Sequence, residues 1–184
     1  MMGSPARMSV FADVKSRAAD RARAEKKSYS GDEERPLGGY LAAMGAYLSV
    51  TGGLALAARL THRQIPAGLS SKDLLLSAVA THKLSRLITK DPVTSPLRAP
   101  FTRYQGQGGP AELTEEVRGT GGRKTVGELI TCPFCMDMWV ATGLVAGLVF
   151  VPRATRLGTG ILAVLAGADL LQFGYSLVEE KEQS

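Results

Sequence analysis

The stretch LGGYLAAMGAYLSVTGGLALAA, residues 37–58, places 22 consecutive positions without a charged side chain in one block. A helix needs roughly 20 predominantly apolar residues to cross about 30 Å of hydrocarbon, so this stretch has the length and composition of a transmembrane helix. We expect the helix to run from about Leu37 to Leu60. Gly45, Ser49 and Gly53 recur in it at four-residue spacing, which would let another helix approach closely.

Two further apolar stretches, residues 133–151 and 157–178, have the same character. The first contains 19 residues, and the second contains 22 residues with Asp169 as its single charge before the acidic tail. Each is long enough to span a bilayer. We expect a short turn at residues 152–156 to join them as an antiparallel pair.

A fourth apolar segment, residues 73–90, differs because His82, Lys83 and Arg86 interrupt its second half. We expect a short span whose basic end reaches the headgroup layer, or a helix that lies partly in the interface. The sequence therefore predicts an all-α integral membrane bundle of about four helices, with three full spans and this shorter or partly interfacial helix.

The remaining parts of the chain are polar. Residues 1–36 are rich in charges of both signs, and they predict either an amphipathic helix at the membrane surface or a solvated tail. The membrane domain, residues 37–178, contains a polar, glycine-rich loop at 89–127, in which residues 111–117 would form one or two helical turns. An acidic tail follows at residues 179–184.

Lys and Arg are distributed unequally between the two sides of a four-span arrangement. Fifteen of them fall in the N-terminal segment, the loop 89–127 and the tail, whereas five fall on the other side. The positive-inside rule then predicts a multi-pass protein of the cell membrane with both termini, the long loop and the cysteines in the cytoplasm.

Cys132 and Cys135 are the two cysteines of the chain and form a Cys-Pro-Phe-Cys motif at a predicted helix start, with Thr131 or Cys132 as the N-cap. Three uses of the motif remain open. Cys132 would attack and Cys135 would resolve in thiol–disulfide exchange. The pair would supply half of a zinc site, completed by His62, His82 or a carboxylate, or shared across a symmetric dimer. The thiols would otherwise cap and pack the end of the helix.

Asp169 lies near the middle of its predicted span, where an ionised carboxylate is costly unless it is paired or protonated. The candidate partners are Arg86, Lys83 and His82 on the segment 73–90, if that helix packs against 157–178. Such a residue serves either as a structural ion pair or as part of a polar path in a small transporter.

Three stretches resemble the bacterial domain-of-unknown-function 1360 family: ATHKLSRLITKD at residues 80–91, SPLR at 95–98 and ELITCPFCMDMW at 128–139. The resemblance covers about residues 70–150. The positions that match in order are Arg86, Asp91, Arg98, Cys132, Pro133, Cys135 and Trp139.

The resemblance implies a small bacterial membrane protein of unestablished activity, with some sporulation-associated members, and it transfers no substrate or cofactor. It also implies that Arg86, Asp91, Arg98 and the two cysteines act together. If the long loop folds back, Asp91 would pair with Arg98 near the thiols.

Classical hydrolase, kinase and dehydrogenase motifs are absent from the sequence. We therefore expect a non-enzymatic structural or scaffold protein with the CxxC motif as an interfacial clamp. A membrane thiol redox protein and a small transporter-like component that uses Asp169 are the alternatives. The expected partners are membrane lipid and further copies or a larger assembly, not nucleic acid, and the expected cofactor is none, or zinc shared across a dimer.

Overall fold

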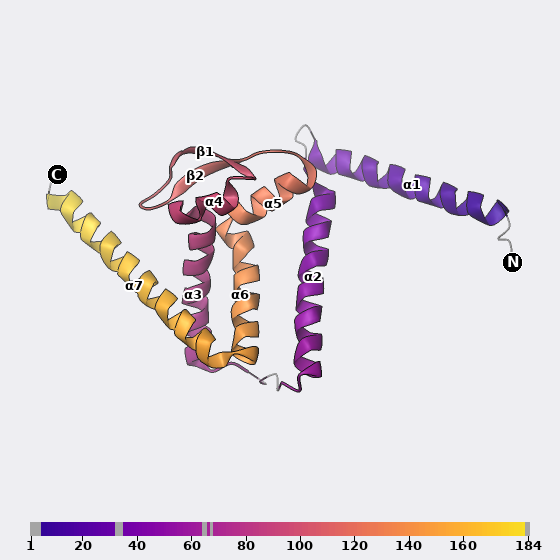
Figure 1. The fold of residues 1–184 in the computed structure, drawn as a ribbon. Helices are drawn as coiled ribbons and strands as arrows, with labels where there is room; N and C mark the ends of the chain where they lie inside the picture. Colours follow the sequence, from indigo (N-terminus) through magenta and orange to yellow (C-terminus); the bar gives the residue numbers. More distant parts are fainter. Residues whose placement is uncertain (1–4, 32–34, 64–65, 67, 183–184) are drawn as a thin grey trace.

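The computed structural model describes residues 5–31, 35–63, 66 and 68–182, which form a helical bundle with one two-stranded sheet (Figure 1). In chain order the elements are α1 (Pro5–Ser30), α2 (Leu37–Leu60), α3 (Ser71–Lys90), the 3-10 turn η1 (Pro92–Thr94), α4 (Ser95–Arg98), β1 (Thr102–Gln107), β2 (Leu113–Val117), α5 (Gly121–Thr131), α6 (Pro133–Phe150) and α7 (Pro152–Glu182).

Three helices of the described chain are long and apolar enough to cross a membrane: Leu37–Leu60, Pro133–Phe150 and Pro152–Glu179. They correspond to the three spans that the sequence predicts. The prediction of an all-α, membrane-associated helical bundle is therefore confirmed.

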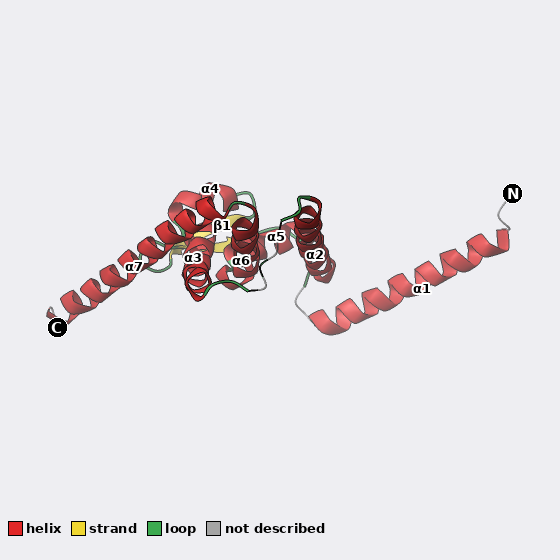
Figure 2. Ribbon diagram, turned by 90° about the horizontal axis from the view of Figure 1, so that it is seen from below, coloured by secondary structure: helices red, strands yellow, loops and turns green. Residues whose placement is uncertain are grey.

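α3 is the fourth helix of the bundle and returns the chain from one end to the other. Figure 1 shows α2 and α6 running in the same direction, with α3 antiparallel to both, and Figure 2 views these three helices nearly along their axes. A chain that crosses twice in one direction must cross back in between. The 20 residues of α3 reach about 30 Å at 1.5 Å per residue, which is enough for that return.

Small and polar side chains fill the interior of the bundle. On α3 the buried positions include Ser77, Ala80, Ser85 and Thr89, and the helix packs against both α6 and α7. Small residues let helix backbones approach closely, which is how helices associate when lipid rather than water surrounds them.

Large apolar side chains point outward instead. They are exposed along α2 and α7, for example at Leu41, Leu48, Leu170 and Leu171. A soluble protein rarely exposes so much contiguous apolar surface, whereas the hydrocarbon of a bilayer covers it without cost.

A compact polar unit, which we call the cap, covers one end of α3 and α6 (Figure 1). It consists of η1, α4, the antiparallel β1–β2 hairpin and α5. α5 continues toward the start of α2, where a Cβ on Gly39 would lie 2.9 Å from the Cβ of Thr125. α2 can therefore approach the cap this closely only because Gly39 has no side chain.

Two features of the cap differ from the sequence prediction. Residues 111–117 do not form helical turns, because 113–117 pair with β1 as the strand β2. Leu113, Glu115 and Val117 alternate inward along that strand, which places a carboxylate rather than an apolar side chain against the cap interior. α5 also departs from the prediction, because Gly121 and Gly122 at its start fall within the predicted glycine-rich loop 89–127.

The connection between α6 and α7 is also shorter than predicted. Residues 152–156 do not form a separate turn, since Pro152 is the first residue of α7 and Val151 alone separates the two helices. A Cβ on Gly147 would lie 2.5 Å from the Thr155 hydroxyl oxygen, so the tight reversal requires glycine there.

Residues 5–30 are helical, as the first of the two alternatives for the N-terminal segment requires. Figure 1 shows α1 leading away from the bundle on the cap side. The C-terminal end of α7 points to the same side, so both ends of the described chain lie on the side of the cap.

Candidate functional site

Arg98 is the centre of the cap and is 0% exposed to solvent. Its Nε forms an ion pair with the Glu115 carboxylate. Nη1 donates to the Ile88 carbonyl at 2.8 Å and to the Thr94 hydroxyl at 2.7 Å, and Nη2 donates to the Asp91 carbonyl at 3.0 Å. The guanidinium therefore joins the end of α3, the turn η1 and the strand β2 in one network.

The expected side-chain pair between Asp91 and Arg98 is not formed. Arg98 reaches the backbone carbonyl of Asp91, while the Asp91 carboxylate accepts the Val93 N–H at 2.8 Å and caps η1. Glu115 is the acid that neutralises Arg98. The sequence does not predict this role of Glu115, because Glu115 lies on β2, where helical turns are predicted.

Cys132 is the residue between α5 and α6, and its Sγ accepts the backbone N–H of Cys135 at 3.3 Å. It is therefore the N-cap of α6, in preference to Thr131, and Pro133 takes the first helical position. Both thiols are free; Cys132 is half-buried and Cys135 is exposed. The motif thus combines a capping sulfur with an accessible one.

A zinc site completed within one copy is not assembled in the described part of the chain. No group of three or more His, Cys, Asp or Glu side chains comes together there with the geometry of a metal site. His62 follows the end of α2 that lies opposite the cap, far from the cysteines (Figure 1). A site that shares Cys132 and Cys135 across two copies is the remaining arrangement with four thiolate ligands.

Trp139 holds α2 against α6. Its ring meets that of Tyr47 edge to face, with centroids 5.3 Å apart and an interplanar angle of 82°. The Tyr47 hydroxyl is 2.8 Å from the hydroxyl of Thr142 on α6. Closer to the cap, the Tyr40 hydroxyl donates to the Glu128 carboxylate at 2.6 Å. Aromatic and hydroxyl contacts of this kind are the main links between α2 and its neighbours.

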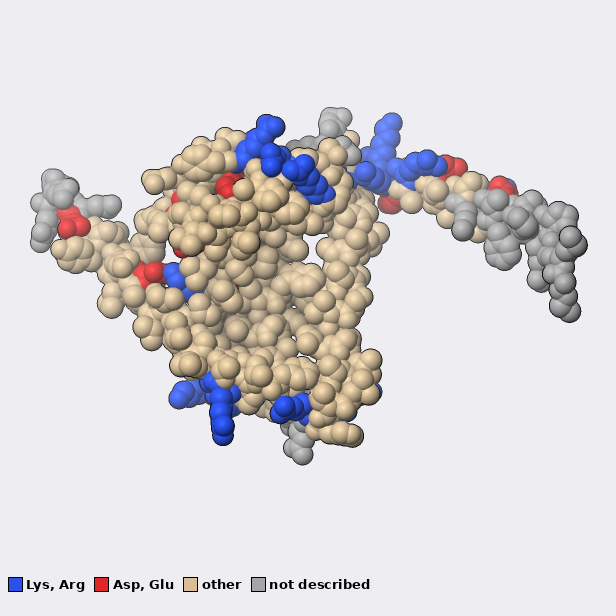
Figure 3. All heavy atoms as spheres, in the orientation of Figure 1, with Lys and Arg blue, Asp and Glu red and all other residues tan. Residues whose placement is uncertain are grey.

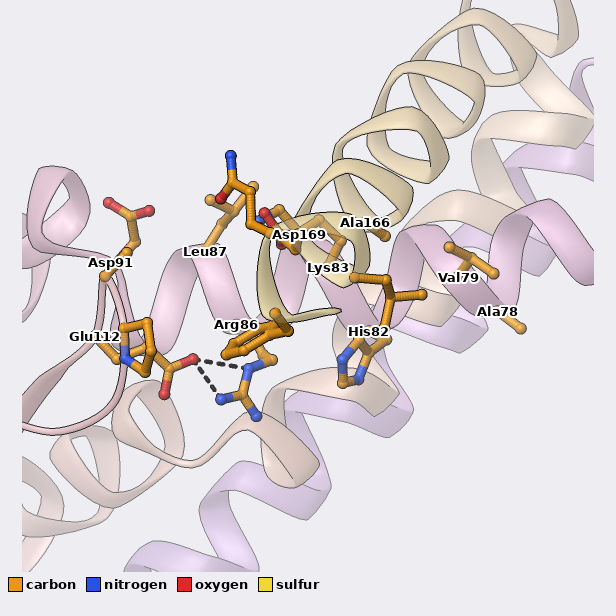
Figure 4. Close-up of a pocket in the computed structure, with 15 residues that line it drawn as sticks. Ala78, Val79, His82, Lys83, Arg86, Leu87, Asp91, Glu112, Ala166 and Asp169 are labelled. Carbon is orange, nitrogen blue, oxygen red and sulfur yellow. Dashed lines mark hydrogen bonds and ion pairs between the residues drawn. The ribbon is translucent and has the colours of Figure 1, made fainter. Parts of the chain in front are cut away.

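A cleft of about 540 Å³ opens between α3, α7 and the turn of the hairpin, and we call it the α3–α7 cleft (Figure 4). It brings together five residues that the sequence singles out, namely His82, Lys83, Arg86, Asp91 and Asp169. Its other lining residues are Ala78, Val79, Leu87, Pro110, Ala111, Glu112, Ala166, Leu170, Gln172 and Phe173.

Two ion pairs lie in the α3–α7 cleft. Asp169 pairs with Lys83, one of the three partners considered from the sequence. Arg86 pairs with Glu112 on the hairpin, and its Nε lies 2.8 Å from the Glu112 Oε1 (Figure 4). The imidazole of His82 lines the cleft without a hydrogen bond to any residue that the structure describes. Arg86, Asp91 and Arg98 are thus neighbours in the fold, but they serve two different networks.

Two further links fasten α3 to the bundle, and neither is predicted from the sequence. The Ser85 hydroxyl donates to the Asp137 carboxylate of α6. At the end opposite the cap, Arg156 donates to both carboxylate oxygens of Asp73, at 2.9 Å and 3.0 Å. Asp137 could have been found by the reasoning applied to Asp169, since it too is an acid within a predicted span.

The chain is similar to a known protein family and to a curated relative. Residues 75–175 match the family described as "Protein of unknown function (DUF1360)". A curated relative, "Sporulation protein YjcA" of Bacillus subtilis (strain 168), is 28% identical over 107 residues, which cover 56% of this chain and 91% of that protein. No solved structure matches the chain. The family match contains most of α3, the cap, α6 and most of α7, and leaves α1 and α2 outside.

Proposed function

This chain belongs to the DUF1360 family of proteins of unknown function, and on that premise we propose that it is a structural protein of the membrane that assembles with other copies or with partner proteins. The proposal includes a cytoplasmic cap and cytoplasmic termini. Fifteen Lys and Arg fall in the parts of the sequence assigned to that side against five on the other, which supports this orientation.

One observation carries the structural role: three residues of the family motif, Arg98, Cys132 and Trp139, make their contacts inside the chain. Arg98 is fully buried and directs four hydrogen bonds to its own fold. The sulfur of Cys132 caps α6, and the ring of Trp139 packs against Tyr47. A catalytic constellation needs donors, acceptors or nucleophiles that are free to meet a substrate, and these three side chains are engaged elsewhere.

The outward apolar faces of α2 and α7 supply the surface for assembly. Leu48 on α2 is 66% exposed and Leu171 on α7 is 77% exposed. In a bilayer such faces meet either lipid or another helix, and helices replace lipid where their surfaces pack more closely.

Photo-crosslinking at those faces tests the proposal. A photoreactive amino acid is placed at Leu48 or at Leu171 in the full-length protein in native membranes, with buried Ala80 as the control position. We expect a discrete protein–protein adduct from at least one outward position and none from Ala80. Crosslinks to lipid alone from both outward positions would contradict the assembly role.

A thiol redox role is the second candidate, because Cys132 and Cys135 are both free and Cys135 is exposed at the first turn of a helix. Redox titration of the metal-free protein separates the two roles. A reversible two-electron couple that either Cys→Ser change abolishes supports redox chemistry. Stoichiometric zinc that is lost in Cys132→Ser supports a clamp shared between copies.

A further inference from the structure

The α3–α7 cleft exists because α7 diverges from α3. The two helices meet at the end opposite the cap, where Arg156 and Asp73 form a salt bridge. Figure 1 shows α7 inclining away from α3 as both approach the cap side, and the pair Lys83–Asp169 spans the widening gap. Glu112 of the hairpin bounds the gap near the cap by pairing with Arg86. A wedge of this kind, set between helices in a bilayer, does not stay empty, because its walls would lose their packing contacts.

The polarity of the cleft changes along α3. Its lining begins with Ala78 and Val79, continues with His82 and Lys83, and reaches Arg86 one turn closer to the cap (Figure 4). The apolar end lies farther from the cap along α3, whereas the charged end lies beside the cap. A phospholipid changes in the same order, from its apolar acyl chains to its charged headgroup.

The charged end carries both signs. Two cations, Lys83 and Arg86, face three carboxylates, Asp91, Glu112 and Asp169. Among the described contacts, Nη1 of Arg86 and the second carboxylate oxygen of Asp91 make no hydrogen bond. A ligand with an anionic and a cationic group therefore finds both an available donor and an available acceptor here.

We propose that the α3–α7 cleft binds a zwitterionic aminophospholipid. The phosphate accepts hydrogen bonds from Arg86 and His82, because a guanidinium matches phosphate geometry. The primary ammonium donates to Asp91 and Glu112, and the acyl chain leaves the cleft beside Val79. This site is independent of the assembly role proposed above.

The charges of the cleft predict the order of preference among lipids. A phosphatidylglycerol headgroup has no ammonium and meets three carboxylates against two cations. A phosphatidylcholine headgroup has a methylated ammonium that cannot donate hydrogen bonds to Asp91 or Glu112. We therefore expect phosphatidylethanolamine to bind more tightly than either of the other two.

Native mass spectrometry of the full-length protein tests the site, with the three lipids added at matched acyl chains. We expect one phosphatidylethanolamine to be retained preferentially. Arg86→Gln should weaken that retention about tenfold, as expected for the loss of a charge-assisted hydrogen bond. Arg103→Gln is the matched control, since Arg103 is an exposed arginine of β1 outside the cleft.

A second variant probes the ammonium end without removing the cap contacts. In Asp91→Asn/Glu112→Gln, the amide oxygens can still accept from Val93 and Arg86, so the fold should be retained, as circular dichroism can verify. We expect this variant to lose the preference for phosphatidylethanolamine over phosphatidylcholine. Equal retention of all three lipids by the wild type would overturn the proposal, as would binding of soluble phosphoethanolamine as tight as that of the lipid. A protein–protein adduct from a crosslinker at Ala166 would overturn it as well, by placing another chain in the cleft.

Discussion

Lys83 on α3 and Asp169 on α7 form an ion pair across 86 positions of sequence. The Lys83 side chain is 17% exposed and that of Asp169 is 41% exposed, so the pair lies at the edge of the bundle, where lipid would surround it. An isolated charge in an apolar medium is unfavourable, and pairing the two opposite charges lowers that free-energy cost. The pair also joins the two helices that border the α3–α7 cleft.

Asp169→Asn leaves Lys83 without its counter-charge, and we expect the free energy of unfolding to fall by about 1–2 kcal/mol, less than the 3–5 kcal/mol typical of a fully buried pair. Replacing both residues, in Lys83→Met/Asp169→Leu, should recover most of the loss. Unfolding in mixed micelles measures both changes. If Asp169→Asn abolished a solute flux while stability stayed unchanged, a transport role would replace the structural one.

Arg98→Lys keeps the positive charge but loses the planar fork that reaches α3, η1 and β2 together. We expect a loss of about 3–5 kcal/mol, because Glu115 and the acceptor carbonyls would remain buried with incomplete partners. Thermal unfolding followed by circular dichroism measures the change. Arg103→Lys, at an exposed position of β1, is the control, and equal stability of the two variants would refute the central role of Arg98.

Cys132→Ala removes the acceptor that caps α6, and we expect a loss of about 1 kcal/mol in the free energy of unfolding. Cys132→Ser should be nearly neutral, since a hydroxyl oxygen is a good N-cap acceptor. Thermal unfolding of the two variants separates the N-cap hydrogen bond of Cys132 from other contributions of its sulfur to stability. A Ser variant as unstable as the Ala variant would show that the thiol stabilises the protein by a contact other than the N-cap hydrogen bond.

Gly39→Ala places a methyl group against Thr125, and we expect it to push α2 away from α5 at a cost of about 1–3 kcal/mol. Gly38→Ala, one position earlier, meets open space and should be neutral or slightly stabilising. Spin labels on α2 and α5 would report the separation directly. An unchanged distance between α2 and α5 in Gly39→Ala would show that the two helices are not packed as closely as the structure has them.

The membrane spans could be predicted because a bilayer imposes a length and an apolar composition that a sequence displays directly. The predicted start of the last span, residue 157, is later than the observed start of α7 at Pro152. Proline is favoured at the first position of a helix, and this preference predicts a helix start at Pro152 as well as at Pro133.

The structure of the cap cannot be predicted from local sequence patterns. β2 carries Glu115 on its inward side, which breaks the usual alternation of apolar and polar positions in a strand. That carboxylate faces inward because Arg98 is buried opposite it, and the pairing depends on a fold that closes 17 residues of chain. Long-range pairing of this kind has no signature in either segment alone.

The polar character of α3 has a consequence for biosynthesis. Lys83, Arg86 and Asp73 make this helix a poor candidate for entering lipid by itself, whereas α2, α6 and α7 have the hydropathy to do so. The residues that neutralise Asp73 and Lys83 are on α7, which is translated after α3. We therefore expect α3 to be integrated after its own synthesis, once the ribosome has delivered α7, which completes its ion pairs.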